Sequence, residues 1–154
     1  MAPQETPLTA ATISALLRQG ATGIAVGRVA LGLTALVWPS VPARPWVGAA
    51  SDDLAARVFG RALGARDLAL GLGALIALRR PPAETGEDGE VVRWVAAGAL
   101  SDALDVAASV SSWPDLPRAG RWLVAASAGG AALTGVAAAL ALRQSRSAPG
   151  LAGR

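Results

Sequence analysis

The sequence contains no cysteine, no histidine and no lysine, and charged residues fill only 16% of its 154 positions. Without cysteine, the chain cannot form disulfides, thiolate metal sites or a cysteine nucleophile. Without histidine, it lacks the commonest metal ligand and the commonest general base. Soluble domains usually hold about 25% charged residues. The shortage of charge therefore favours a membrane protein over a soluble one.

Apolar residues make up 53% of the chain, and the mean hydropathy is +0.43. This length suits a single domain, taken as residues 1–154. All fourteen basic residues are arginine, and the formal net charge is +3. Because these arginines are scattered through or beside apolar runs, they do not form the solvent-facing basic patch of a nucleic-acid-binding protein. Arginine at the ends of membrane helices is the simpler interpretation.

Four apolar stretches predict membrane spans at about residues 21–38, 58–78, 91–112 and 121–142. Only the last stretch has the full length of uncharged apolar sequence that a spanning helix requires, from Trp122 to Leu142. Prolines follow the first three stretches and end them. Short connections make this an all-α, four-helix transmembrane bundle of up-down-up-down topology. A soluble four-helix bundle with buried salt bridges is the alternative.

The remaining segments are predicted as follows. Thr9 to Gln19 forms a short helix that Gly20 ends, lying at the membrane interface or fraying as part of the tail. Pro39 to Ala50 forms an ordered loop. Ser51 caps the second helix, which begins at Asp52 and enters the apolar layer near residue 58. Residues 1–7 and 144–154 are polar or basic tails, predicted to be disordered.

Tryptophan placement supports the membrane interpretation. Four tryptophans lie at predicted helix ends and Trp46 lies in the predicted loop, as an interfacial aromatic belt requires; the four are Trp38, Trp94, Trp113 and Trp122. The two tails and the second loop hold more arginine than the other loops. By the positive-inside rule, we expect a multi-pass protein of a bacterial plasma membrane with both termini in the cytoplasm.

Small residues mark one face of the second helix. Gly60, Gly64, Asp67 and Gly71 are spaced four, three and four apart and therefore share that face. Glycines at such spacing let a second helix approach closely. The first helix carries Gly23 and Gly27 at the same spacing of four. These glycines are predicted to pack helices within the bundle or between two protomers of a homo-oligomer.

Six charged residues lie towards the middle of the predicted spans rather than at their very ends: Arg28, Arg61, Arg66, Asp67, Asp102 and Asp105. Each costs roughly 2.5–3.5 kcal/mol to insert, so six without partners would cost on the order of 15–20 kcal/mol. Pairing inside the bundle is therefore close to obligatory. We expect Asp102 and Asp105 to face Arg28 and Arg61, Asp67 to lie at the glycine contact, and Arg66 to meet the third helix or another neighbour.

Several functions remain open for this network. It can bind a small ligand or a lipid head group, since charge inside a membrane marks a functional site by default. It can instead be purely structural, fixing helix register in a protein that serves as an accessory subunit of a membrane complex. A proton- or ion-coupled small transporter is a third hypothesis. Asp102 and Asp105 could hold Mg²⁺ on adjacent turns, but nothing marks a substrate, so an enzyme is disfavoured and no cofactor or metal site is predicted.

The run from Gly60 to Gly71 resembles an uncharacterised family of small four-helix membrane proteins of bacteria and fungi. That family carries a Gly-x-Arg-Asp-x-x-x-Gly pattern in its second helix, matched here by Gly64, Arg66, Asp67 and Gly71. The architecture is more distantly similar to the DoxX-like membrane proteins. The resemblance covers roughly residues 21–142; it implies the fold and the membrane location, and no established activity.

Overall fold

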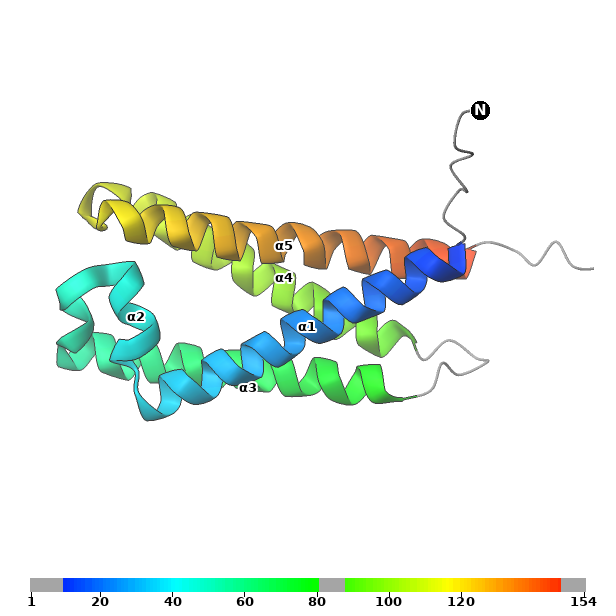
Figure 1. Cartoon of the computed structure of the whole chain (residues 1–154), viewed down its shortest axis with the longest axis horizontal. Coiled ribbons are helices and arrows are strands. Elements are labelled where there is room, and N and C mark those ends of the chain that lie inside the picture. Colours follow the sequence, from blue (N-terminus) through cyan, green and yellow to red (C-terminus); the bar gives the residue numbers. More distant parts are fainter. Residues whose placement is uncertain (1–9, 81–87, 148–154) are drawn as a thin grey trace, which may run out of the picture.

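The computed structural model describes residues 10–80 and 88–147, and every regular element in those two ranges is helical. There are five α-helices and two 3₁₀ turns (Figure 1). In chain order they are α1 (Ala10–Val37), α2 (Ser40–Val47), η1 (Gly48–Asp52), α3 (Leu54–Arg79), α4 (Asp88–Ser111), η2 (Trp113–Asp115) and α5 (Arg118–Ser147).

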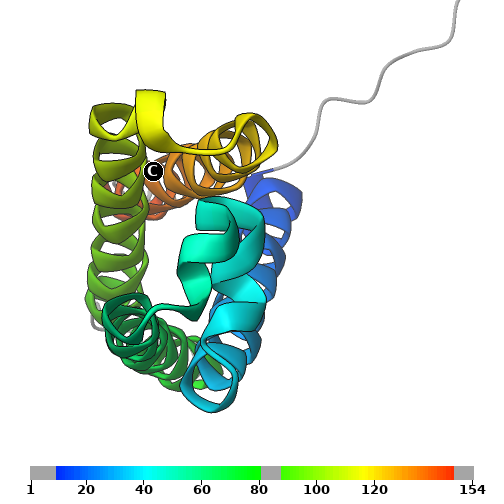
Figure 2. The ribbon, with the colours of Figure 1, turned by 90° about the vertical axis from the view of Figure 1, so that its left-hand side faces the viewer.

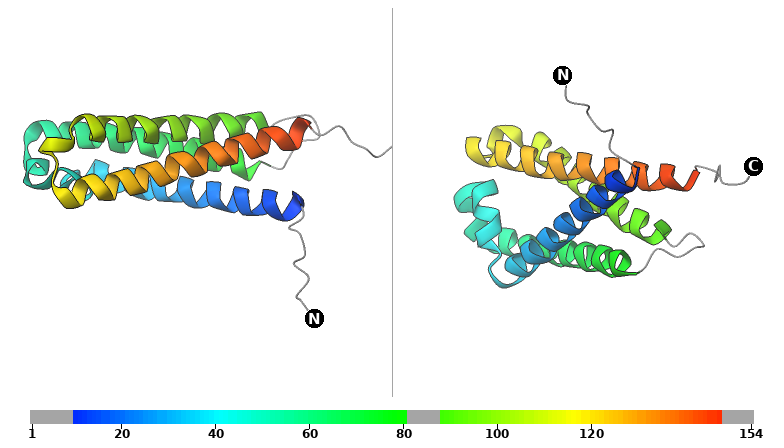
Figure 3. Two further views of the ribbon diagram at one scale, coloured as in Figure 1. Left: turned by 90° about the horizontal axis from the view of Figure 1, so that it is seen from above. Right: turned by 45° about the vertical axis from the view of Figure 1, so that its right-hand side comes forward.

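The four long helices run alternately up and down and form a ring in the order α1, α3, α4, α5, with the short α2 across one end (Figure 2). The most extensive contacts are between α1 and α3 and between α4 and α5, whereas α1 and α5 touch little. The start of α1 and the end of α5 lie at the same end of the molecule, opposite α2 (Figure 3). The molecule is therefore two helical hairpins joined mainly through α3 and α4.

The α1–α3 seam is close because glycine backbones meet there. A Cβ on Gly64 would lie 2.7 Å from Ala35 Cβ, and one on Gly32 would lie 2.6 Å from the Gly64 carbonyl oxygen. Gly71 faces the backbone of α1 in the same way, with 2.7 Å between its hypothetical Cβ and Ala25 O. Any larger residue at these positions would force the two helices apart.

Gly23 and Gly27 do not contribute to this seam. A Cβ on either would have no heavy atom within 4 Å, so the predicted packing role of these two glycines within the chain is wrong. Gly60 lies at the end of the seam, where its Cβ would meet Pro39 Cβ at 3.2 Å. The pattern on α3 located the close contact, but α1 turns Gly32 rather than the Gly23–Gly27 pair towards it.

Small residues also fill the other seams. Gly73 of α3 lies against the indole ring of Trp94, and Gly135 of α5 lies against Ala99 of α4. Ala77, Val91, Val92 and Ala139 form a small buried cluster at the end of the bundle away from α2. These contacts leave little room for large side chains between the helices.

The distribution of side-chain size is the reverse of that in the core of a soluble protein. The largest fully buried side chains are those of two serines, Ser51 and Ser109, and no leucine, isoleucine or phenylalanine is buried in the described ranges. By contrast Phe59 is 69% exposed and Leu133 is 75% exposed, and all four long helices carry exposed large apolar side chains. The bundle thus places small and polar groups inside and large apolar groups outside.

The predicted loop after the first helix is instead mostly helical, and Trp46 lies in α2. Prolines 42 and 45 are tolerated because the first turn of a helix has no partners for its N–H groups and α2 is only eight residues long. The Ser40 hydroxyl donates to Ser51 O at 3.0 Å, which ties α2 to η1. A Cβ on Gly120 would lie 2.2 Å from Trp46 O, so α5 begins directly against α2.

Three further boundaries differ from the predictions. The segment Thr9 to Gln19 is not a separate helix in its described part, because α1 continues without a break through Gly20. Ser51 does not cap the second long helix; α3 begins at Leu54 after Asp53, whose side chain makes no capping bond. Finally α5 extends to Ser147, so residues 144–147 are helical. The predicted tails at 1–7 and 148–154 lie outside the described residues.

Candidate functional site

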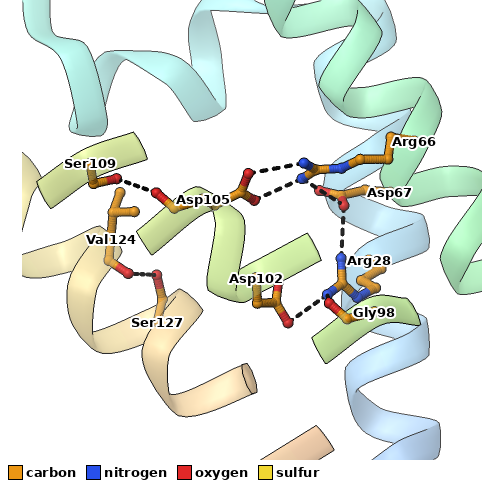
Figure 4. Close-up of polar contacts among 9 residues, drawn as sticks. All are labelled: Arg28, Arg66, Asp67, Gly98, Asp102, Asp105, Ser109, Val124 and Ser127. Atoms are coloured by element: carbon orange, nitrogen blue, oxygen red, sulfur yellow. Dashed lines mark hydrogen bonds and ion pairs between the residues drawn. The ribbon is translucent and has the colours of Figure 1, made fainter. Parts of the chain in front are cut away.

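Five of the six charged residues singled out in the sequence meet at the middle of the bundle (Figure 4). They form a row of alternating sign that we call the charge cluster: Asp102, Arg28, Asp67, Arg66 and Asp105. Three helices supply them, since Arg28 belongs to α1, Arg66 and Asp67 belong to α3, and the other two aspartates belong to α4. The row therefore links both hairpins through side chains.

Arg28 is the link between all three helices. Its Nη1 donates to Asp67 Oδ1 at 2.8 Å, and its Nη2 lies 2.6 Å from Asp102 Oδ2. The same Nη2 donates to the Gly98 carbonyl oxygen at 2.8 Å. Only 10% of the Arg28 side chain is exposed. The guanidinium lies directly against Gly98, since a Cβ there would be in ordinary contact with Arg28 Nε at 3.4 Å.

Arg66 makes the second interhelical pair. Its two terminal nitrogens donate to the two carboxylate oxygens of Asp105 at 2.9 and 2.8 Å, the planar bidentate geometry that arginine favours. Arg66 Nη2 also reaches Asp67 Oδ1 at 3.3 Å. Adjacent residues on α3 thus serve different partners, and Asp67 Oδ1 receives hydrogen bonds from both arginines. Ser109 secures the helix beside this pair by donating to Asp105 O at 2.7 Å.

Arg61, the sixth residue, lies outside the cluster. Its Nε donates to Leu36 O at 3.2 Å in an exposed position, so the predicted pairing of Arg61 with a carboxylate of the third helix is wrong. Arg66 makes the pair with a carboxylate of α4 that was expected of Arg61. Arg66 lies about one and a half turns further along α3 than Arg61, at the level of Asp105.

A cavity of about 530 Å³ adjoins the cluster and extends towards α2. All five cluster residues line it, and α1, α2, α3 and α5 supply walls that are mostly apolar. Leu31, Leu63, Leu123 and Trp46 are among the wall residues, and Gly27 opens the wall on α1. Cavities of roughly 300–1,000 Å³ with apolar walls and a few polar groups are typical of small-molecule sites.

The cluster does not neutralise itself. Three aspartates face two arginines, so the formal charge is −1 when all five are ionised, and no other charged residue lines the cavity in the described part of the chain. Asp102 and Asp105, considered as ligands for Mg²⁺, are paired with different arginines instead. The described residues contain no group of three or more potential metal ligands.

The sequence suggested a polar cavity at the charged residues, but it gave neither the position of the cavity nor its apolar walls. The signal for Gly27 was present in the sequence, but a glycine pair on an apolar helix predicts a helix contact as readily as an opening. Because the segment that forms α2 was predicted to be a loop, the cavity wall that α2 supplies was not predicted either. Neither the carbonyl of Gly98 nor the indole of Trp46 carries a sequence signature for such a role.

No protein-family model matches this chain, and no curated protein and no solved structure is significantly similar to it. The resemblance to small four-helix membrane proteins therefore stays a prediction. It rests on Gly64, Arg66, Asp67 and Gly71, together with the run from Gly27 to Gly32 and the acidic third helix around Asp102 and Asp105.

Proposed function

We propose that this chain is an integral membrane protein whose four long helices span the bilayer and whose central cavity binds a small, largely apolar molecule. The single observation that carries the binding role is the cavity of about 530 Å³ whose lining includes five paired, buried or part-buried charges. A set of ion pairs that served only to hold helices together would need no such space beside it.

Length, composition and burial together support the membrane location. Two segments, Arg18–Val37 and Arg118–Leu140, are long and apolar enough to cross a bilayer. A core helix of a soluble protein would pass that test too, but it would be mostly buried. Here only 28% and 17% of the two apolar windows are buried. Their apolar surfaces face outwards, where lipid would satisfy them.

The other two long helices, α3 and α4, hold most of the charge cluster, which lowers their hydropathy. Their outer faces carry large apolar side chains such as Phe59, Ile76 and Leu104. The cluster residues on these two helices point inwards and are paired, the arrangement that makes intramembrane charge tolerable. Small residues line the helix contacts, as is usual where lipid rather than water surrounds a bundle.

The aromatic residues support a defined interface at the α2 end. Trp38 and Trp122 are 65% and 68% exposed, and both lie at helix ends next to α2 and η2. Trp113 stacks edge-on against Trp122 at 5.2 Å, and Arg121 lies 5.5 Å above the Trp113 ring. Tryptophan and arginine side chains of this kind prefer the head-group layer of a membrane.

The test uses two matched glycines of α1. Gly27 lines the cavity and Gly23, one turn away, does not, and both have open space at the Cβ position. We expect native mass spectrometry of gently extracted wild-type protein and of Gly23→Leu to show a bound small molecule that Gly27→Leu has lost. An empty wild-type protein, or a ligand unaffected by Gly27→Leu, would favour a purely structural network.

A further inference from the structure

The charge cluster has an uncompensated carboxylate, and this property selects among ligands. The row begins and ends on aspartate, so no rearrangement of the five partners can pair every charge. Inside a low-dielectric site an unpaired charge is costly, and it is neutralised either by a proton or by a bound ion of opposite sign. The site is therefore electrostatically prepared for one additional positive charge.

The hydrogen-bonding inventory of the cluster leads to the same selection. Asp67 uses Oδ1 for both arginines, and Asp102 uses Oδ2 for Arg28. No hydrogen bond from the described residues reaches the other oxygen of either side chain, although Asp67 and Asp102 are only 7% and 8% exposed. Both residues line the cavity, so the acceptors that remain belong to its wall.

The donors of the same wall carry no unpaired positive charge. Each arginine already lies within ion-pair distance of two carboxylates. The contacts of each guanidinium occupy both N–H groups of Nη2 and one of the two on Nη1. The indole N–H of Trp46 is a further donor of the wall, buried and without a partner among the described residues. The surplus negative charge, rather than a lack of donors, therefore favours a cation over an anion, and N–H donors on that cation would pair the remaining carboxylate oxygens.

The size and lining of the cavity indicate the chemical character of the rest of the ligand. The cavity is far larger than an ammonium group, and the walls away from the cluster are apolar side chains of α1, α3 and α5 together with Trp46 of α2. From these observations we infer that the cavity binds a monocationic amphiphilic amine, with its ammonium group between Asp67 and Asp102 and its apolar body directed towards α2. The inference rests on the proposed function, since it names the ligand class of that cavity.

The amine can be a free lipophilic amine or a cationic lipid whose head group is a primary amine without an anionic group, because both present the same ammonium donor. Native mass spectrometry separates them by mass, since a lipid and a small free amine differ several-fold in size. Either identity supports the inference, whereas a co-purified anion or a neutral molecule without N–H donors overturns it.

The direct experiment titrates purified wild-type protein in a neutral detergent with three probes of one shape and different charge: 1-adamantylamine, 1-adamantanol and 1-adamantanecarboxylate. Calorimetry at neutral pH should give an affinity for the amine at least about tenfold above that for the alcohol, a difference of about 1.4 kcal/mol. The carboxylate should bind more weakly than the alcohol. Equal affinities for amine and alcohol, or tighter binding of the carboxylate, would overturn the inference.

Two variants keep this outcome separate from failure of the proposed function. Asp102→Asn removes the surplus charge and should lower amine affinity to that of the alcohol, while Arg61→Gln, outside the cluster, should not change it. Gly27→Leu should weaken all three probes together. If no probe binds and Gly27→Leu changes nothing, the cavity itself is not a binding site; if probes bind in the cavity without preference for the amine, only the ligand class is wrong. Because the comparison among probes is made in wild-type protein, it stands even if Asp102→Asn does not fold.

Discussion

Replacing Arg28 by methionine tests whether the charge cluster holds the helices together. Methionine keeps most of the length and the apolar stem of arginine but removes the contacts to Asp67, Asp102 and the Gly98 carbonyl, at 2.8, 2.6 and 2.8 Å. Asp67 would retain Arg66 at 3.3 Å, whereas Asp102 would lose its only cationic partner among the described residues. The variant therefore breaks one buried pair completely.

Removing one partner of a buried pair typically costs about 3–5 kcal/mol, because the other charge is left unpaired. Total stabilities are on the order of 5–15 kcal/mol, so this loss would remove a large share of the fold's stability. The matched control is Arg61→Met, which removes an exposed side chain with one hydrogen bond to Leu36 O. A substitution of that kind should change stability by less than about 1 kcal/mol.

The assay is reversible unfolding in mixed micelles with increasing sodium dodecyl sulfate, followed by far-ultraviolet circular dichroism. The double variant Arg28→Met, Asp102→Asn should recover about 1–2 kcal/mol, because neutralising the orphaned carboxylate removes part of the penalty. If Arg28→Met costs no more than Arg61→Met, or if Asp102→Asn adds its full cost to the Arg28 variant, the cluster does not stabilise the bundle.

Three further predictions follow from the packing. Gly71→Ala should destabilise the protein by about 1–3 kcal/mol in the same assay, because its Cβ would lie 2.7 Å from Ala25 O. The control Gly23→Ala has open space at its Cβ and should leave stability unchanged or raise it by up to about 1 kcal/mol. Equal effects of the two substitutions would contradict the close packing of α1 against α3. Trp46→Phe removes a buried indole N–H that has no partner among the described residues, so unfolding of the ligand-free protein should cost only about 1–2 kcal/mol less, from the packing lost with the smaller ring. A loss above about 3 kcal/mol would contradict the absence of a partner. Reporters fused to the two chain ends should lie on the same side of the membrane, and opposite locations would exclude four spans.

The helical content and the residues of the charge cluster were predictable because both depend on composition and spacing. A charged residue inside an apolar run can be recognised in the sequence without knowledge of the surrounding structure. The partners were harder, since they depend on the rotation and register of each helix. Arg61 and Arg66 are separated by about one and a half turns, and a small shift of α3 against α4 decides which of them reaches Asp105.

The α2 segment shows where local rules give too little information. Three prolines over seven residues suggested a loop, but prolines 42 and 45 occupy a helix so short that few N–H groups have intrahelical partners. The packing of this turn against Gly120 involves residues distant in sequence. Because α2 supplies one wall of the cavity, the cavity could not be predicted without it.

The order of the cluster along the chain has a consequence for biosynthesis, given the membrane insertion that we propose. Arg28 emerges from the ribosome first and has no counterion until α3 brings Asp67, and its second partner on α4 arrives later still. Arg66 and Asp67 arrive together and leave the net charge of the cluster unchanged. The helix α4 then adds the two remaining carboxylates of the cluster and no arginine to it. The nascent chain is thus electrically incomplete until α4 is synthesised, and quality-control factors that recognise exposed intramembrane charge would retain any chain that stops before it.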